Sequence, residues 1–119
     1  MRVMIVDDSR TARLMLKKVL PPSLLVDVVE AGGGKEAVER CQSERIDLMF
    51  LDLTMPEYDG FDVLEALKAG GAVPRTVVVS ADAQPLARER VVGLGALAFI
   101  KKPASRAEIE RVLKESGVL

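Results

Sequence analysis

The sequence predicts an α/β fold in which one sheet of five parallel strands carries helices on both of its faces. Short apolar runs alternate with helical patterns along the whole chain. This alternation is typical of right-handed strand–helix–strand units. Several of the runs are almost wholly apolar, as expected for parallel strands that are covered on both faces. Together these features predict a doubly wound parallel sheet.

The five apolar runs read as strands because they are rich in Val, Ile, Leu or Phe and are bounded by charges, glycine or proline. They are Val3–Val6, Leu25–Val29, Leu48–Leu51, Thr76–Val79 and Ala98–Ile100. The first, third and fourth contain hardly any polar residue, so we expect both of their faces to be buried.

A helical pattern follows each strand. Ser9 and Ser105 are suited to cap helices, and Pro85 suits a first helical turn. The helices are expected from Ser9 to Leu20, Gly34 to about Ser43, Asp59 or Gly60 to Ala69, Pro85 to about Leu94, and Ser105 to about Glu115.

The first helix uses Leu14, Leu16 and Val19 as its apolar positions, so its remaining side chains can be divided between core and solvent. We expect Met15 at or near the core. Arg13 is expected on the open face of the helix, with contact to a partner as the alternative.

Length and composition limit the classes of function. The chain has 119 residues, which fits one domain over residues 1–119. The net charge of −1 gives no general attraction to nucleic acid or membranes, and no stretch approaches the ~18 apolar residues of a membrane span. The single Cys41 suits a reducing cytoplasm. The absence of histidine excludes Ser-His-Asp catalysis and His–Zn sites.

Polar side chains follow four of the predicted strands. They are Asp7 and Asp8, then Asp52, then Ser80, and finally Lys101 and Lys102. Ligands of open α/β sheets bind beyond the carboxyl ends of the strands, so we expect these side chains to meet. Converging carboxylates repel one another unless a hard cation such as Mg²⁺ lies between them. With a lysine and a hydroxyl added, the sequence predicts a phosphoryl-transfer site in which a carboxylate is the acceptor.

Four segments carry a resemblance to the receiver domains of bacterial two-component response regulators, and it extends over essentially the whole chain. They are Val-Asp-Asp-Ser (6–9), Leu-Asp-Leu-Thr-Met-Pro-Glu-Tyr-Asp-Gly (51–60), Val-Ser-Ala-Asp (79–82) and Phe-Ile-Lys-Lys-Pro (99–103). The beginning of the chain looks most like stand-alone chemotaxis-type receivers. The resemblance implies a flavodoxin-like sheet with strand order 2-1-3-4-5.

The resemblance also implies a role for each site residue. Asp52 is the phosphoryl acceptor, and Asp8, Asp52 and the Thr54 carbonyl bind Mg²⁺. Asp7 acts largely through water. The family's lysine directly precedes a proline, which selects Lys102 over Lys101 as the partner of the phosphoryl group, and the Lys102–Pro103 peptide is expected to be cis.

A switch follows from the same resemblance. Ser80 moves toward the phosphoryl group, and Phe99, at the position of the family's switch aromatic, turns inward behind it. Since Phe99 lacks a polar tip, we expect it to prefer the outward rotamer less than a tyrosine would. The face made by the fourth helix, the fifth strand and the fifth helix would then change its affinity for a downstream protein.

The implied partners are a histidine kinase as phosphoryl donor and a downstream protein, with no nucleic acid or membrane bound by this domain. We expect a cytoplasmic monomer, with weak dimerisation as the alternative, and no turnover enzyme. One alternative is a receiver cut from a longer regulator such as a transcription factor. Others are a haloacid-dehalogenase-type phosphatase, because Asp52 and Thr54 resemble the loop of those enzymes, and a degenerate receiver that only binds.

Overall fold

The computed structural model describes residues 1–82 and 84–119 and confirms the predicted α/β architecture. The strands are β1 (Val3–Val6), β2 (Val28–Ala31), β3 (Leu48–Leu51), β4 (Arg75–Ser80) and β5 (Ala98–Lys101). The helices are α1 (Arg10–Val19), α2 (Gly34–Ser43), α3 (Gly60–Ala69), α4 (Pro85–Gly93) and α5 (Arg106–Glu115), with a short 3₁₀ helix η1 (Pro22–Leu25).

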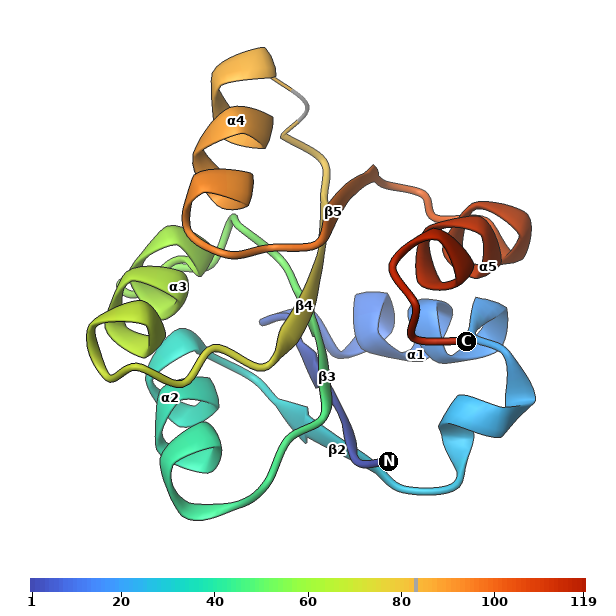
Figure 1. Ribbon diagram of the computed structural model, residues 1–119, viewed down its shortest axis with the longest axis horizontal. Helices are drawn as coiled ribbons and strands as arrows, with labels where there is room; N and C mark the ends of the chain where they lie inside the picture. The colour runs from blue at the N-terminus through green and yellow to red at the C-terminus, as the bar shows by residue number, and fades with distance from the viewer. Residues whose placement is uncertain (83) are drawn as a thin grey trace.

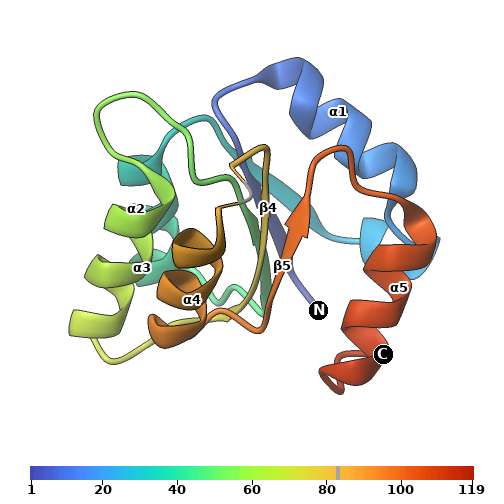
Figure 2. The same ribbon diagram turned by 90° about the horizontal axis from the view of Figure 1, so that it is seen from above.

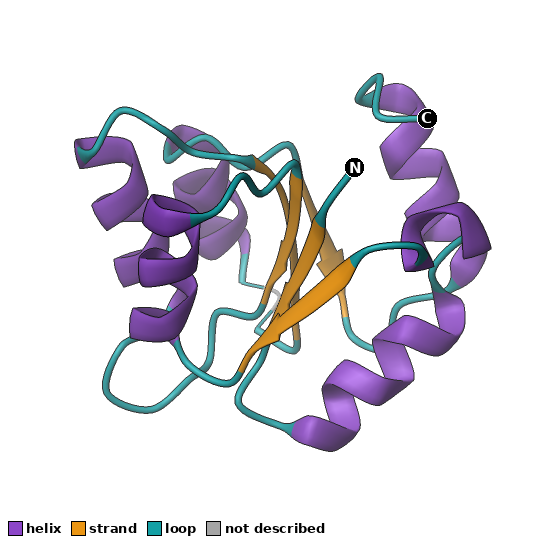
Figure 3. Ribbon diagram, turned by 90° about the horizontal axis from the view of Figure 1, so that it is seen from below, coloured by secondary structure: helices purple, strands orange, loops and turns teal. Residues whose placement is uncertain are grey.

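All five strands pair in parallel in the order β2-β1-β3-β4-β5, which confirms the flavodoxin-like topology. Helices α2, α3 and α4 cover one face of this sheet, and α1 with α5 cover the other (Figures 1 and 2). The same three layers are visible in Figure 3, where the strands lie between two groups of helices. Within the described chain, no helix is both long enough and apolar enough to span a membrane.

The core divides into two largely aliphatic clusters, one on each face of the sheet. Alternate residues of β1 illustrate the division, since Met4 packs toward α2 and α3 whereas Ile5 packs toward α1 and α5. Both side chains are almost completely buried. Because helices cover the sheet on both sides, its buried polar side chains lie at or next to the ends of strands.

The second strand begins later than the sequence predicted. We expected Leu25–Val29, but Pro22 begins a 3₁₀ turn that ends at Leu25, and Val26 is 88% exposed. Pairing starts only at Val28, which lies opposite Val3 of β1. The predicted bounds were wrong because the register with β1, and not local hydrophobicity, determines where this strand begins.

Helix α1 is rotated relative to the predicted orientation. Met15 is 57% exposed, so its placement at or near the core was wrong, and Leu14 is exposed as well. The half-buried stripe instead includes Leu16 and Arg13. Helix α1 has no fully buried residue, so its apolar side chains do not fix its rotation. The helix instead turns the side that carries Arg13 toward the end of β2, where Arg13 pairs with Glu30.

Candidate functional site

The backbone at the carboxyl end of the sheet is held by hydrogen bonds that continue beyond the strands. Three amides donate to carbonyls of neighbouring strands: Asp7 to Ala31 (3.2 Å), Asp52 to Val6 (3.0 Å) and Lys102 to Ser80 (3.0 Å). These bonds fix the position from which each of the three side chains projects. Asp7, Asp52 and Lys102, which follow separate strands, therefore lie at the same edge of the sheet.

Three carboxylates converge at this edge. One oxygen from each of Asp7, Asp8 and Asp52 lies within 4.8 Å of the others. Asp7 and Asp52 are buried, with only 5% and 3% of their surface exposed, whereas Asp8 is exposed. Asp7, Asp8 and Asp52 together with Lys102 are called the acidic site below. A set of converging carboxylate oxygens with an open side fits a hard divalent cation such as Mg²⁺.

Lys102 supplies the positive charge of the acidic site. Its Nζ lies 2.7 Å from Asp7 Oδ2 and 3.5 Å from Asp52 Oδ2. Burial lowers the pKa of Lys102, but the contacts with Asp7 and Asp52 together outweigh burial, so the net pKa is raised. Lys102 therefore stays protonated at neutral pH and bridges the two buried carboxylates.

The negative charge of the Asp52 carboxylate is only weakly compensated by its surroundings. The nearest donors besides Lys102 are the Thr54 amide and hydroxyl, each 3.4 Å from Asp52 Oδ1. Burial raises the pKa of Asp52, Lys102 opposes this, and the neighbouring charge of Asp7 adds to the rise, which leaves the pKa above its usual value. A buried carboxylate with long hydrogen bonds retains lone pairs for a metal ion or an incoming electrophile.

Ser80 ends β4 beside the acidic site and is completely buried. Its hydroxyl oxygen accepts a hydrogen bond from the Asp82 amide at 3.3 Å. The hydroxyl proton can rotate to donate to another acceptor. Ser80 thus places at the end of β4 a buried hydroxyl that is able to donate a hydrogen bond.

Arg13 is a neighbour of the acidic site that the sequence analysis missed. Its Nη1 donates to the backbone carbonyl of Asp7 at 2.6 Å, and its Nε donates to Glu30 at 2.8 Å. Only 16% of its side chain is exposed, so placing it on the open face of α1 was wrong. A signal was available, because Glu30 follows the second predicted strand and offers a carboxylate to a basic residue on the first helix.

The loop after β3 is shaped by a glycine. A Cβ at Gly60 would clash with the backbone oxygen of Asp52 and with Leu53, so only glycine fits where α3 begins. In the same loop Glu57 has φ of 67°, and the Tyr58 amide donates to the Pro56 carbonyl at 2.7 Å. On the opposite side of the site, the Lys102–Pro103 peptide is cis, as predicted.

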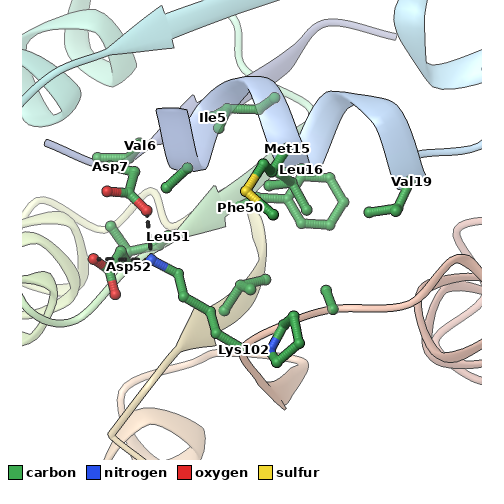
Figure 4. Close-up of a pocket in the computed structure, with 14 residues that line it drawn as sticks. Ile5, Val6, Asp7, Met15, Leu16, Val19, Phe50, Leu51, Asp52 and Lys102 are labelled. Carbon is green, nitrogen blue, oxygen red and sulfur yellow. Dashed lines mark hydrogen bonds and ion pairs between the residues drawn. The ribbon is translucent and has the colours of Figure 1, made fainter. Parts of the chain in front are cut away.

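A cavity of about 360 Å³ opens beside the acidic site, between α1 and the sheet. Figure 4 shows Lys102 with its amine directed at Asp7 and Asp52, while apolar side chains such as Phe50 and Leu16 lie to one side. Since Asp7, Asp52 and Lys102 all line this cavity, it belongs to the acidic site. The Lys102 side chain therefore borders an open space.

Phe99 lies on β5 at the edge of the sheet and is half-buried. The guanidinium carbon of Arg88, on α4, lies 4.7 Å from the centre of its ring. The predicted switch aromatic is therefore in contact with a neighbouring helix as well as with the core beneath it.

Comparison with known proteins identifies the family. The model of the response regulator receiver domain matches residues 3–114. Chemotaxis protein CheY of Bacillus subtilis is 36% identical over 113 residues, covering 95% of this chain and 92% of that protein. A protein-glutamate methylesterase/protein-glutamine glutaminase of Myxococcus xanthus is 38% identical over 120 residues, but the match covers only 34% of its length.

Solved structures agree with the sequence comparison. A chain in the crystal structure of the CheX–CheY–BeF3–Mg²⁺ complex from Borrelia burgdorferi superposes with a TM-score of 0.87 at 29% identity, covering 99% of this chain and 90% of that one. The strand order, the acidic site and the family match all point the same way. The chain belongs to the family of response regulator receiver domains of two-component systems.

Proposed function

We propose that the chain is a phosphorylation-dependent signalling switch in which Asp52 accepts a phosphoryl group from a phosphohistidine of a partner kinase. The observation that carries the proposal is the buried Asp52 carboxylate at the end of β3, flanked by Lys102, Asp7 and Asp8. Members of this family are signalling switches and not turnover enzymes. The family match also removes the reason to consider a haloacid-dehalogenase-type phosphatase.

Each side chain has a defined task in the transfer. An oxygen of Asp52 attacks phosphorus, the bond from phosphorus to the kinase histidine breaks, and that nitrogen leaves with the electron pair, so that an acyl phosphate forms. Lys102, already 3.5 Å from Asp52, pairs with the negative charge that the phosphoryl oxygens carry. The Ser80 hydroxyl donates a hydrogen bond to another phosphoryl oxygen.

Receiver domains bind Mg²⁺ in an acidic pocket, and the acidic site fits this ion. Asp8 and Asp52 would hold it directly together with the Thr54 carbonyl, and Asp7 would act largely through water. The ion supplies positive charge that neutralises the phosphoryl oxygens. Asp7 meanwhile keeps Lys102 in place through their 2.7 Å contact.

The output is a change in protein binding. Once Ser80 moves toward the phosphoryl group, Phe99 can occupy the space behind it, and the face of α4, β5 and α5 changes its affinity for a downstream protein. We propose a cytoplasmic monomer of the chemotaxis type, since the match to Bacillus subtilis CheY extends over nearly the whole of both chains. A receiver within a longer regulator is the second candidate, which the partial match to the methylesterase favours.

Incubation with Mg²⁺ and a small acyl-phosphate donor, followed by intact-mass measurement, tests the proposal. One phosphoryl group per chain is expected in the wild-type protein and in Asp27→Ala, whose side chain is 47% exposed and lies outside the acidic site. Asp52→Ala should gain none. An unmodified wild type, or equal modification of Asp52→Ala, would show that Asp52 is not the acceptor.

A further inference from the structure

Two arginines of helix α4 each stack on an aromatic ring. The guanidinium carbon of Arg90 lies 4.2 Å from the centre of the Phe61 ring on α3, and that of Arg88 lies 4.7 Å from the centre of the Phe99 ring on β5. Both distances fall within the range of a cation–π contact. The two arginines therefore hold α4 between its neighbours on either side.

The two arginines differ in whether a carboxylate also pairs with the guanidinium. The Nη2 atom of Arg90 also donates to the carboxylate of Glu65 at 2.6 Å, so ring and carboxylate are both engaged. Within the part of the chain that the structure describes, Arg88 forms no ion pair and no side-chain hydrogen bond. A guanidinium has five N–H donors along its edge, and stacking on a ring leaves that edge free.

The surroundings of Arg88 favour an anionic group with an apolar neighbour. Val92 lies one helical turn further along the same side of α4 and is 56% exposed. Glu89 follows Arg88 directly, and consecutive helical residues do not face each other, so its carboxylate belongs to another side of the helix. Arg88, Val92 and Phe99 are called the α4–β5 surface below.

We propose that the α4–β5 surface binds a protein partner through a carboxylate side chain that pairs with Arg88 while an adjacent apolar side chain of the partner covers Val92. Arg90 is paired with the Glu65 carboxylate while it stacks on Phe61. The partner's carboxylate would pair in the same way with Arg88 while Arg88 stacks on Phe99. The inference rests on the proposed function because it gives the chemistry of the downstream partner of the switch.

The binding energy comes from a preorganised cation. Stacking on Phe99 restricts the Arg88 side chain before the partner arrives, which lowers the entropy that binding must overcome. The planar edge also suits a carboxylate better than a lysine would, because two parallel hydrogen bonds can form. Loss of the ring contact when Phe99 moves would therefore change the affinity for the partner, which links this surface to Asp52.

The test is a peptide titration followed by NMR on the metal-free protein. The probe is the peptide acetyl-Leu-Asp-Glu-Leu-Asp-amide, and the control is the same peptide with Asn and Gln in place of its acids. The acidic peptide is expected to shift the Arg88 Nε–Hε and Phe99 ring signals, and the amide control is not. Equal binding of the two peptides, or binding that leaves the Arg88 signal unchanged, would overturn the proposal.

Matched variants separate a specific contact from general attraction. Arg88→Gln and Arg90→Gln each remove one positive charge from α4, yet only Arg88 offers a free edge. We expect Arg88→Gln to weaken the affinity for the acidic peptide about fivefold or more, and Arg90→Gln to change this affinity less than about twofold. Arg88→Lys, which keeps the charge without the planar edge, should also bind more weakly than wild type.

Equal weakening by Arg88→Gln and Arg90→Gln would contradict the inference and indicate attraction by net charge alone. Each variant's backbone spectrum shows in the same experiment that it is folded. Since the titration needs neither Mg²⁺ nor a phosphoryl donor, its failure leaves phosphorylation of Asp52 untouched. Conversely, an unphosphorylated Asp52 in the mass experiment would not alter the result of the titration.

Discussion

The acidic site and the α4–β5 surface place charged groups in opposite environments. In the acidic site two carboxylates are almost completely buried, and sheet hydrogen bonds fix the backbone of Asp7 and Asp52. On the α4–β5 surface, Arg88 is exposed and rests on the half-buried ring of Phe99 at the sheet edge. If the proposed functions hold, the comparison teaches that phosphoryl transfer uses fixed, desolvated charges, whereas recognition uses exposed charges that a partner can still pair.

Replacing Lys102 should have the largest effect, because it removes the cation from the buried carboxylates. In Lys102→Met the rate of phosphorylation by a small acyl phosphate should fall about 100-fold. The metal-free protein should also lose about 1–2 kcal/mol of unfolding free energy, a value reduced by the 30% exposure of the Lys102 side chain. Initial rates by mass spectrometry and urea unfolding measure the two effects.

Lys101→Met is the matched control, since Lys101 is the exposed residue immediately before Lys102. It should change stability by less than about 0.5 kcal/mol and leave the rate unchanged. Equal effects of the two substitutions would contradict the assignment of Lys102 to the acidic site.

Asp52→Asn should stabilise the metal-free protein. Burial raises the pKa of Asp52 in the folded state above its ordinary value of 3.8, so ionisation of this carboxyl opposes folding. The penalty is complete above the folded-state pKa and disappears as the pH falls below the unfolded value. We expect Asp52→Asn to gain on the order of 1 kcal/mol at pH 7, and the gain to vanish in acid.

Urea unfolding of wild type and Asp52→Asn across that pH range measures the difference in unfolding free energy, to which carboxyls remote from the acidic site contribute equally in both proteins. Mg²⁺ should reduce the difference in unfolding free energy between the two proteins, because it stabilises the wild type more than the variant. A less stable Asp52→Asn at pH 7 without metal would argue against a poorly compensated buried carboxylate.

Arg13→Met tests the boundary of the acidic site. The substitution removes the hydrogen bonds from Arg13 to the Asp7 carbonyl and to Glu30, and it should cost about 1 kcal/mol of unfolding free energy. Contacts with Lys17 and Arg13 lower the pKa of Glu30 despite partial burial, so this stabilisation should be lost as the pH falls through the acid range. Arg10→Met, at an exposed position of the same helix, should be neutral in thermal and urea unfolding.

The smallest expected effect distinguishes the two arginines of α4. Arg90→Gln breaks the ion pair with Glu65 as well as the stack on Phe61, and it should cost about 0.5–1 kcal/mol. Arg88→Gln loses only the contact with Phe99 and should cost less than about 0.5 kcal/mol. Side-by-side urea titrations would refute the contrast if Arg88→Gln proved the more destabilising of the two.

The sequence predicted the acidic site better than the surfaces around it. Asp7 and Asp52 directly follow strands that are buried along their whole length. Ser80 is the last residue of β4, and Lys102 follows the edge strand β5. Parallel strands bring such residues together at one edge whatever the details of packing. The contacts of Arg13 and Arg88 depend on how a helix is rotated against the sheet. That rotation is set by tertiary packing, to which the hydrophobic pattern of a single helix is a weak guide.

The same distinction explains the fold. The bounds of β1 and β3 were predicted correctly because charged residues end apolar runs that are buried on both faces. The start of β2 was wrong because Leu25 and Val26 are apolar yet belong to a 3₁₀ turn and the segment after it. Only the pairing partner Val3 fixes where β2 begins, and a partner distant in sequence leaves no local signal.

The most direct test of the account is chemical identification of the phosphorylated residue. After phosphorylation with Mg²⁺ and a small acyl phosphate, borohydride reduction converts an aspartyl phosphate to homoserine, which peptide sequencing by mass spectrometry locates. We predict homoserine at position 52 alone, and none in a sample prepared without the donor. Homoserine at Asp7 or Asp8, or a stable phosphate on Ser80 or Thr54 with Asp52 intact, would contradict the assignment of Asp52 as the acceptor.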